Sequence, residues 1–133
     1  MTVVWVLLAL VILGMAFIRL APSDPTRWHV APKGDKDKNL EGGVVRIVET
    51  GPLGLKKLNA VVQADATTRT LAGSVDEGMV TYISRTKVMG FPDYTTAQQD
   101  GDTLRIYGRL RFGRSDFGVN RNRVDGWLGQ INP

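Results

Sequence analysis

The chain of 133 residues carries 17 lysines and arginines against 13 acidic residues, has a net charge of +4, and contains no cysteine and one histidine. The length fits one domain with a short appendage. The lack of cysteine excludes disulfides, thiolate metal sites and thiol nucleophiles, and one histidine does not supply the ligand set of a zinc enzyme. The small positive charge suits an anionic partner without specifying one.

Residues 1–21 predict a transmembrane anchor. No charged side chain precedes Arg19, and the run from Val3 to Ile18 is apolar. At about 1.5 Å per residue, such a helix spans roughly 27–31 Å, the thickness of a hydrocarbon core. A buried helix of a soluble domain would show a polar stripe, and a cleaved signal peptide would begin with basic residues. We therefore expect an uncleaved single-pass anchor that contacts the lipid bilayer, with Arg19 at the membrane interface.

Residues 22–43 predict an extended linker. Pro22 and Pro25 favour extended backbone before them, and the segment from Lys33 to Asn39 alternates charge without apolar partners, which is typical of a solvated and mobile chain. Trp28 has two interpretations, one at the membrane interface and one packed on the soluble domain. The following residue, His29, is expected to be an ordinary surface residue.

Residues 44–133 predict an α+β domain. β-Branched runs and alternating apolar residues indicate strands, and apolar residues at spacings of three and four indicate helices. Pro92 is expected to interrupt a strand, and Asp100-Gly101 predicts a hairpin. We expect a small antiparallel sheet with two helices packed on one face. The predicted elements are strands at 44–49, 70–75, 79–89, 94–97 and 103–112, and helices at 53–66 and from Val124 to Ile131.

Two aspartates, Asp93 and Asp116, lie near predicted turns and form the only candidate acid–base pair. Acid–base catalysis would require both carboxylates to reach a substrate in a cleft, with a shifted pKa on at least one. The structural alternative is that Asp93 bonds backbone amides across the turn at Pro92 and that Asp116 either caps the last helix or pairs with an arginine. We favour the structural interpretation and retain a hydrolase as a minor alternative.

Arginines are concentrated near the C-terminus. If the strand at 103–112 and the start of the last helix converge, these side chains form a basic patch suited to phosphate, anionic lipid or an acidic protein surface. The alternative is an ordinary solvated sheet face whose arginines pair with Asp93, Asp100 and Asp102. A membrane anchor and the small net charge argue against nucleic acid as a partner. The arginines are Arg105, Arg109, Arg111, Arg114, Arg121 and Arg123.

The segment Phe91-Pro92-Asp93-Tyr94, followed by the segment from Arg114 to Val124, resembles the signature of the DUF1499 family, a bacterial and plastid family of unknown function. The stretch from Arg19 to His29 is similar to alphaproteobacterial members, so the resemblance covers nearly the whole chain. It implies the fold of the soluble part and no particular chemistry. Several relatives are exported or lipid-anchored, whereas the positive residues after the anchor favour a cytoplasmic domain.

From these observations we expect a non-catalytic accessory or scaffold domain that docks on a larger respiratory or photosynthetic complex of a bacterial inner membrane, with a slight preference for the cytoplasmic face. The alternative is a lipid or small-molecule binding module of the membrane surface. We expect no cofactor and no metal. The candidate interaction surface comprises Phe91, Asp93, Tyr94, Arg105, Arg109, Arg111, Arg114, Asp116, Asn120 and Arg121, and the candidate membrane-interface residues are Arg19 and Trp28.

Overall fold

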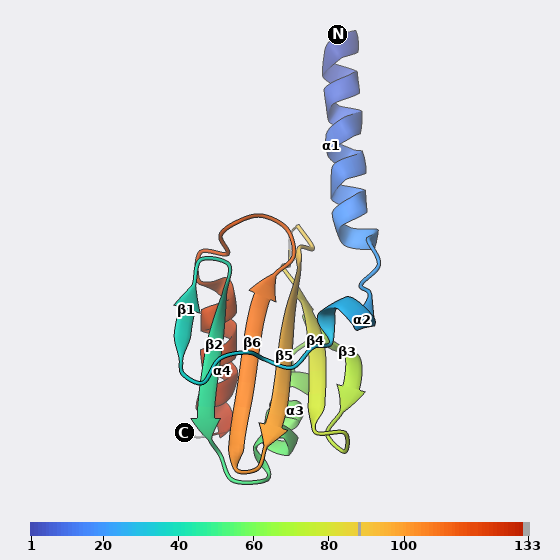
Figure 1. Ribbon diagram of the computed structural model, residues 1–133. Coiled ribbons are helices and arrows are strands. Elements are labelled where there is room, and N and C mark those ends of the chain that lie inside the picture. Colours follow the sequence, from blue (N-terminus) through green and yellow to red (C-terminus); the bar gives the residue numbers. More distant parts are fainter. Residues whose placement is uncertain (88, 132–133) are drawn as a thin grey trace.

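The computed structural model describes residues 1–87 and 89–131, and its most prominent feature is a long N-terminal helix that projects from a small α+β domain (Figure 1). This helix, α1 (Thr2–Leu20), has no buried residue. It has 19 residues, its most apolar stretch of 18 residues has a mean hydropathy of 2.6, and it meets the length and composition of a membrane span. An apolar helix with no buried residue fits a membrane anchor or a signal sequence rather than a core helix.

The domain is built on one antiparallel sheet of six strands in the order β1-β2-β6-β5-β4-β3. The chain runs up and down through neighbouring strands from β3 to β6, and β2 then pairs with β6 from the other side. The predicted α+β class is therefore confirmed. The strands are β1 (Lys38–Leu40), β2 (Gly43–Glu49), β3 (Thr68–Ser74), β4 (Met79–Arg85), β5 (Pro92–Asp100) and β6 (Thr103–Leu110).

Strand β6 shows why the sequence forms this sheet. Leu104 and Ile106 are fully buried on one face, whereas Arg105 and Tyr107 point to the other, as the alternation of the strand requires. The strand ends at Leu110, two residues earlier than expected, and β4 ends at Arg85 instead of residue 89. Pro92 does not interrupt a strand but begins β5, a position where its missing N–H is tolerated.

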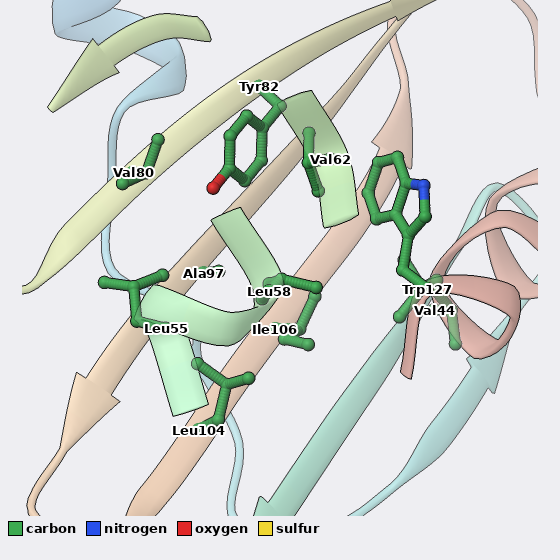
Figure 2. Packing of buried hydrophobic residues seen from close by; sticks show 11 residues of the cluster. Val44, Leu55, Leu58, Val62, Val80, Tyr82, Ala97, Leu104, Ile106 and Trp127 are labelled. Carbon is green, nitrogen blue, oxygen red and sulfur yellow. The ribbon is translucent and has the colours of Figure 1, made fainter. Parts of the chain in front are cut away.

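Both helices of the domain cover the same face of the sheet, as predicted (Figure 1). Helix α3 (Gly54–Gln63) buries Leu55, Leu58 and Val62, and helix α4 (Val119–Ile131) buries Val124 and Trp127. Figure 2 shows these side chains packed against residues from β2, β4, β5 and β6. The hydrophobic core therefore lies between the sheet and the two helices.

The opposite face of the sheet carries a segment that we call the strap, residues 21–37. It begins at the end of α1, includes the one-turn helix α2 (Pro25–Trp28), and crosses the strands before it enters β1 (Figure 1). The ring of Trp28 stacks on Tyr94 with 4.0 Å between ring centroids and 13° between planes. Nδ1 of His29 lies 2.7 Å from Oγ1 of Thr81.

These contacts correct the interpretation of residues 22–43 as an extended and mobile linker. The strap packs on the sheet, and its continuation from Lys38 to Leu40 forms an edge strand paired with β2. The sequence concealed this because the contacts of Trp28 and His29 with the sheet join residues more than fifty positions apart. Of the two interpretations of Trp28, its packing on Tyr94 matches the one in which the indole contacts the soluble domain.

Replacement of Trp28 by alanine should loosen the strap. The stacked pair contributes about 0.5–1.5 kcal/mol beyond the area that it buries, so amide exchange in residues 21–37 should accelerate by roughly tenfold. Hydrogen-exchange mass spectrometry of the full chain in detergent measures this. Val30→Ala, at a side chain that is 42% exposed, is the matched control. Unchanged exchange in Trp28→Ala would show that the backbone contacts alone hold the strap.

Candidate functional site

The predicted arginine patch is divided by the fold into separate places. Arg105, Arg109 and Arg111 share the face of the sheet under the strap, whereas Arg123 lies on α4 and pairs with Asp93. Arg114 and Arg121 are exposed, in the loop after β6 and in the first turn of α4.

The three sheet arginines bind the strap. Arg109 donates to the carbonyl oxygen of Trp28, Arg111 donates to that of Pro22 at 2.8 Å, and Arg105 donates to that of Gly34. Arg109 is only 7% exposed, and its burial lowers the pKa of the guanidinium to about 10, so it remains charged at neutral pH. The side chains predicted to contact an external partner are therefore engaged by the chain itself.

A second group of candidate residues forms a buried polar cluster on the helix-covered face. Asp93 and Asn120 come from β5 and α4 and are 5% and 0% exposed. Nη1 of Arg123 donates to Oδ2 of Asp93 at 3.2 Å and to Oδ1 of Asn120 at 2.8 Å. Nδ2 of Asn120 in turn donates to Oδ2 of Asp116 at 2.9 Å. The guanidinium of Arg123 thus binds the carboxylate of Asp93 directly and is linked to that of Asp116 through the side-chain amide of Asn120.

Asp116 also determines the start of α4. Its Oδ1 accepts from the backbone N–H of Gly118 at 2.9 Å, and its Oδ2 accepts from that of Asn120 at 3.0 Å. These are donors that the first turn of a helix leaves unpaired, so the predicted capping role of Asp116 is observed. The turn between these residues places Phe117 at φ 53°, with a side chain that is 92% exposed.

The predicted role of Asp93 across the turn at Pro92 is replaced by its contact with α4. Burial raises the pKa of Asp93, and the nearby charge of Asp116 acts in the same direction, whereas Arg123 opposes them. Arg123 was predicted as a member of the arginine patch but not of the candidate interaction surface. The alternative interpretation paired the patch with Asp93 among other aspartates, and the spacing of three between Asn120 and Arg123 on a helix is a further signal of shared orientation.

The cluster borders a pocket of about 310 Å³ at one end of the sheet. Phe112, in its wall, contacts Phe17 in the last turn of α1, with 6.1 Å between ring centroids. Nη1 of Arg85, at the end of β4, donates to the carbonyl oxygen of Ile18 at 3.4 Å. The pocket therefore lies close to the last turn of α1. Figure 1 shows α1 projecting from this end of the domain. The pocket is lined by Phe91, Leu110, Phe112, Phe117 and Val119 together with Thr86, Asp93, Ser115 and Asp116.

In the described part of the chain, the candidate catalytic side chains form neither a metal site nor a serine–histidine pair. Within residues 1–87 and 89–131, no group of three or more histidine, aspartate or glutamate side chains could hold a metal ion. Ser115 lines the pocket, but His29 bonds Thr81 on the strap-covered face of the sheet and is not near it. Asp93 and Asp116 both line the pocket, and burial raises the pKa of Asp93, as the acid–base alternative requires. Their carboxylates are engaged with a guanidinium, an amide and backbone amides, which favours the structural interpretation.

The fold and site define a class: a small α+β domain attached to an apolar N-terminal helix, with a pocket at the helix-proximal end. The chain belongs to the DUF1499 family, whose model, described as a protein of unknown function, matches residues 18–131. The match includes the strap as well as the sheet and helices. No curated protein matches the chain.

Proposed function

We propose that this protein is a non-catalytic, membrane-anchored module that binds a lipid or another small amphiphile in the pocket beside α1. The observation that carries the proposal is the position of the pocket, because Phe112 belongs both to its wall and to the contact with Phe17 of α1. A lipid in the leaflet that surrounds the last turn of α1 could reach this pocket without crossing water. The volume of about 310 Å³ is at the lower end of ligand pockets and suits one end of an amphiphile.

The lining indicates the chemistry of that ligand. Five of the lining side chains are apolar and favour a hydrocarbon segment. The acidic side chains in the lining are the buried Asp93 and Asp116, which share one guanidinium. A ligand end that donates hydrogen bonds, such as a hydroxyl or an amine, is therefore compatible with the site, whereas an anionic end would be repelled.

A direct test uses the full chain in vesicles of phosphatidylethanolamine and phosphatidylglycerol that contain a lipid with a photoactivatable acyl chain. We expect cross-links to Phe91 and Leu110 inside the pocket. Val119→Trp should fill the pocket and remove these cross-links. Leu53→Trp places the same ring at a 55% exposed position near the opposite end of the sheet and should preserve them. Cross-links confined to α1 in the unmodified chain would contradict the proposal.

Docking on a larger inner-membrane complex is the second candidate. The exposed residues Arg114, Phe117 and Arg121 support it, because arginine and aromatic side chains are frequent anchors of protein interfaces. The engagement of Arg105, Arg109 and Arg111 with the strap removes the larger patch on which the hypothesis first relied. Affinity purification from gently solubilised native membranes tests it, since an accessory subunit would be recovered with one complex in near-stoichiometric amount.

We extend the proposal to the kind of membrane that holds α1 and to the side of that membrane on which the domain lies. The positive residues from Arg19 to Lys38 favour a domain on the cytoplasmic face of a bacterial inner membrane. Protease protection in sealed inverted and right-side-out membrane vesicles distinguishes the two faces. Degradation of the domain in inverted vesicles alone would support the cytoplasmic face.

A further inference from the structure

We propose that the loop between β6 and α4, residues 111–118, lies in the membrane interface beside α1, with Phe117 inserted among the lipids and Arg114 and Arg121 on anionic headgroups. The inference requires that α1 remains as an anchor. It does not depend on whether the pocket holds a ligand. The partner is the lipid surface itself, in contrast to a single lipid molecule bound inside the domain.

The first argument is one of depth. A helix of 19 residues is about 28 Å long, which is close to the thickness of a hydrocarbon core. Phe17 lies in the last turn of this helix and therefore near the boundary of the core. The ring of Phe112 contacts Phe17, so the beginning of the loop is held at that boundary. Arg85, which donates to the carbonyl oxygen of Ile18, brings the end of β4 to the same level.

The second argument is the conformation of Phe117. Its side chain is 92% exposed and its φ is 53°, a region that bulky side chains rarely occupy. The backbone is held there by Asp116, which accepts from Gly118 and Asn120, and by Oγ of Ser115, which accepts from the N–H of Phe117 at 3.2 Å. Glycine would adopt this conformation more easily. The domain gains nothing from the ring in the packing of its described residues, whereas a lipid surface would bury it.

The third argument is the charge around the loop. Arg114 and Arg121 are exposed on either side of Phe117, and the last turn of α1 carries Arg19. Asp116 in the loop and Asp93 near the start of β5 are buried in the polar cluster. Glu41, in the turn before β2, is the exposed acid close to the loop, because its carbonyl oxygen accepts from the N–H of Asp116. The balance is therefore positive and favours anionic headgroups.

Single-cysteine labelling tests the inference, because the chain has no native cysteine. Phe117→Cys and Leu53→Cys are each labelled with an environment-sensitive fluorophore in the full chain and reconstituted in vesicles of phosphatidylcholine and phosphatidylglycerol. Leu53 is 55% exposed near the far end of the sheet. We expect a quencher on the lipid chains to act severalfold more strongly at 117 than at 53, and a water-soluble quencher to show the reverse. Equal quenching at the two positions would overturn the proposal.

Removal of charge tests the headgroup contact. In the chain labelled at position 117, we compare the amount of label that lies in the lipid with the amount that lies in water. Each of the variants Arg114→Gln and Arg121→Gln should reduce this ratio by about fivefold, as expected for one basic residue at an anionic surface. Lys56→Gln and Lys57→Gln, at exposed positions of α3, should leave the ratio unchanged. The same ratio in all four variants, or in vesicles of phosphatidylcholine alone, would exclude a role for the two arginines.

Two further variants separate this inference from folding and from the pocket. Phe117→Gly should raise the unfolding temperature or leave it unchanged. A label at Val119→Cys in that background should nevertheless be withdrawn from the lipid, relative to Val119→Cys alone. Val119→Trp, which fills the pocket, should leave a label at 117 immersed. Loss of immersion in Val119→Trp would mean that the ligand in the pocket, and not the loop, produces the membrane contact.

Discussion

Replacement of Arg123 by methionine is expected to lower the free energy of unfolding by about 3–5 kcal/mol at neutral pH, because a buried carboxylate loses its cationic partner. Asp93 is 5% exposed, and the guanidinium of Arg123 lies 3.2 Å from its Oδ2. The same change removes the hydrogen bond that Arg123 donates to Oδ1 of Asn120, and so disturbs the link from Asn120 to Asp116. Chemical denaturation of the full chain in detergent at several pH values measures the loss.

The pH dependence of this loss has a definite sign. Burial already raises the pKa of Asp93, although Arg123 opposes the shift. A carboxyl group with a raised pKa in the folded state binds more protons there than in the unfolded state. Protonation of Asp93 therefore stabilises the folded state fully below about pH 4, and this stabilisation is lost as the pH rises through the folded-state pKa. In Arg123→Met that pKa rises further, so the loss should be small in acid and grow toward neutral pH.

The double variant Asp93→Asn with Arg123→Met is the control for the charge. It removes the titrating group, so the additional pH dependence should disappear and part of the lost stability should return at neutral pH. An equal loss in Arg123→Met at acidic and neutral pH would show that the packing of the arginine side chain, and not its charge, supports the cluster.

Gly43→Ala is expected to cause the second large effect, a loss of about 3 kcal/mol or more. A Cβ atom on Gly43 would lie 2.2 Å from the carbonyl oxygen of Gly108 and 3.1 Å from Cα of Arg109. Both atoms belong to the backbone of β6, which pairs with β2 at this position. Neither strand can move away without breaking hydrogen bonds at this end of the ladder between β2 and β6.

Gly126→Ala is the matched control because it makes the same chemical change without the clash. Gly126 lies inside α4, and a Cβ atom there meets no neighbouring atom within 4 Å. Alanine is the better helix former by about 1 kcal/mol, so this variant should be more stable than the natural chain. Thermal unfolding followed by circular dichroism compares the two. If Gly43→Ala unfolded at the temperature of the natural chain, the close approach of β2 and β6 would be disproved.

Local patterns were sufficient to predict most of the domain. Alternation in β6 and the spacing of Val124, Trp127, Leu128 and Ile131 reflect burial of one face, which each element encodes in its own sequence. The ends of strands were less accurate, because alternation continues to Phe112 although the ladder stops at Leu110. Strand β1 was missed because three residues, Lys38 to Leu40, are too few to show a period.

The candidate site was only partly predictable. Asp93 and Asp116 were recognised as residues near turns, but the contact of Asp93 with Arg123 joins positions thirty residues apart and has no local signal. The arginines of β6 were placed correctly on one face, yet the partner of that face was taken to be external. In fact it is the strap, whose carbonyl oxygens and Trp28 ring make contacts that depend on tertiary structure alone.

The packing of the strap determines where this chain can be cut. A soluble fragment that began at residue 40 would leave Tyr94 without its stacked indole and Arg109 without the carbonyl of Trp28. It would also uncover the face of the sheet on which the strap packs. Such a fragment should aggregate or bind detergent for reasons unrelated to its natural ligand. A cut just before Ala21, which is 5% exposed, would retain the whole strap. The smallest unit suitable for ligand screening or crystallisation therefore includes the segment that the sequence predicts as a mobile linker.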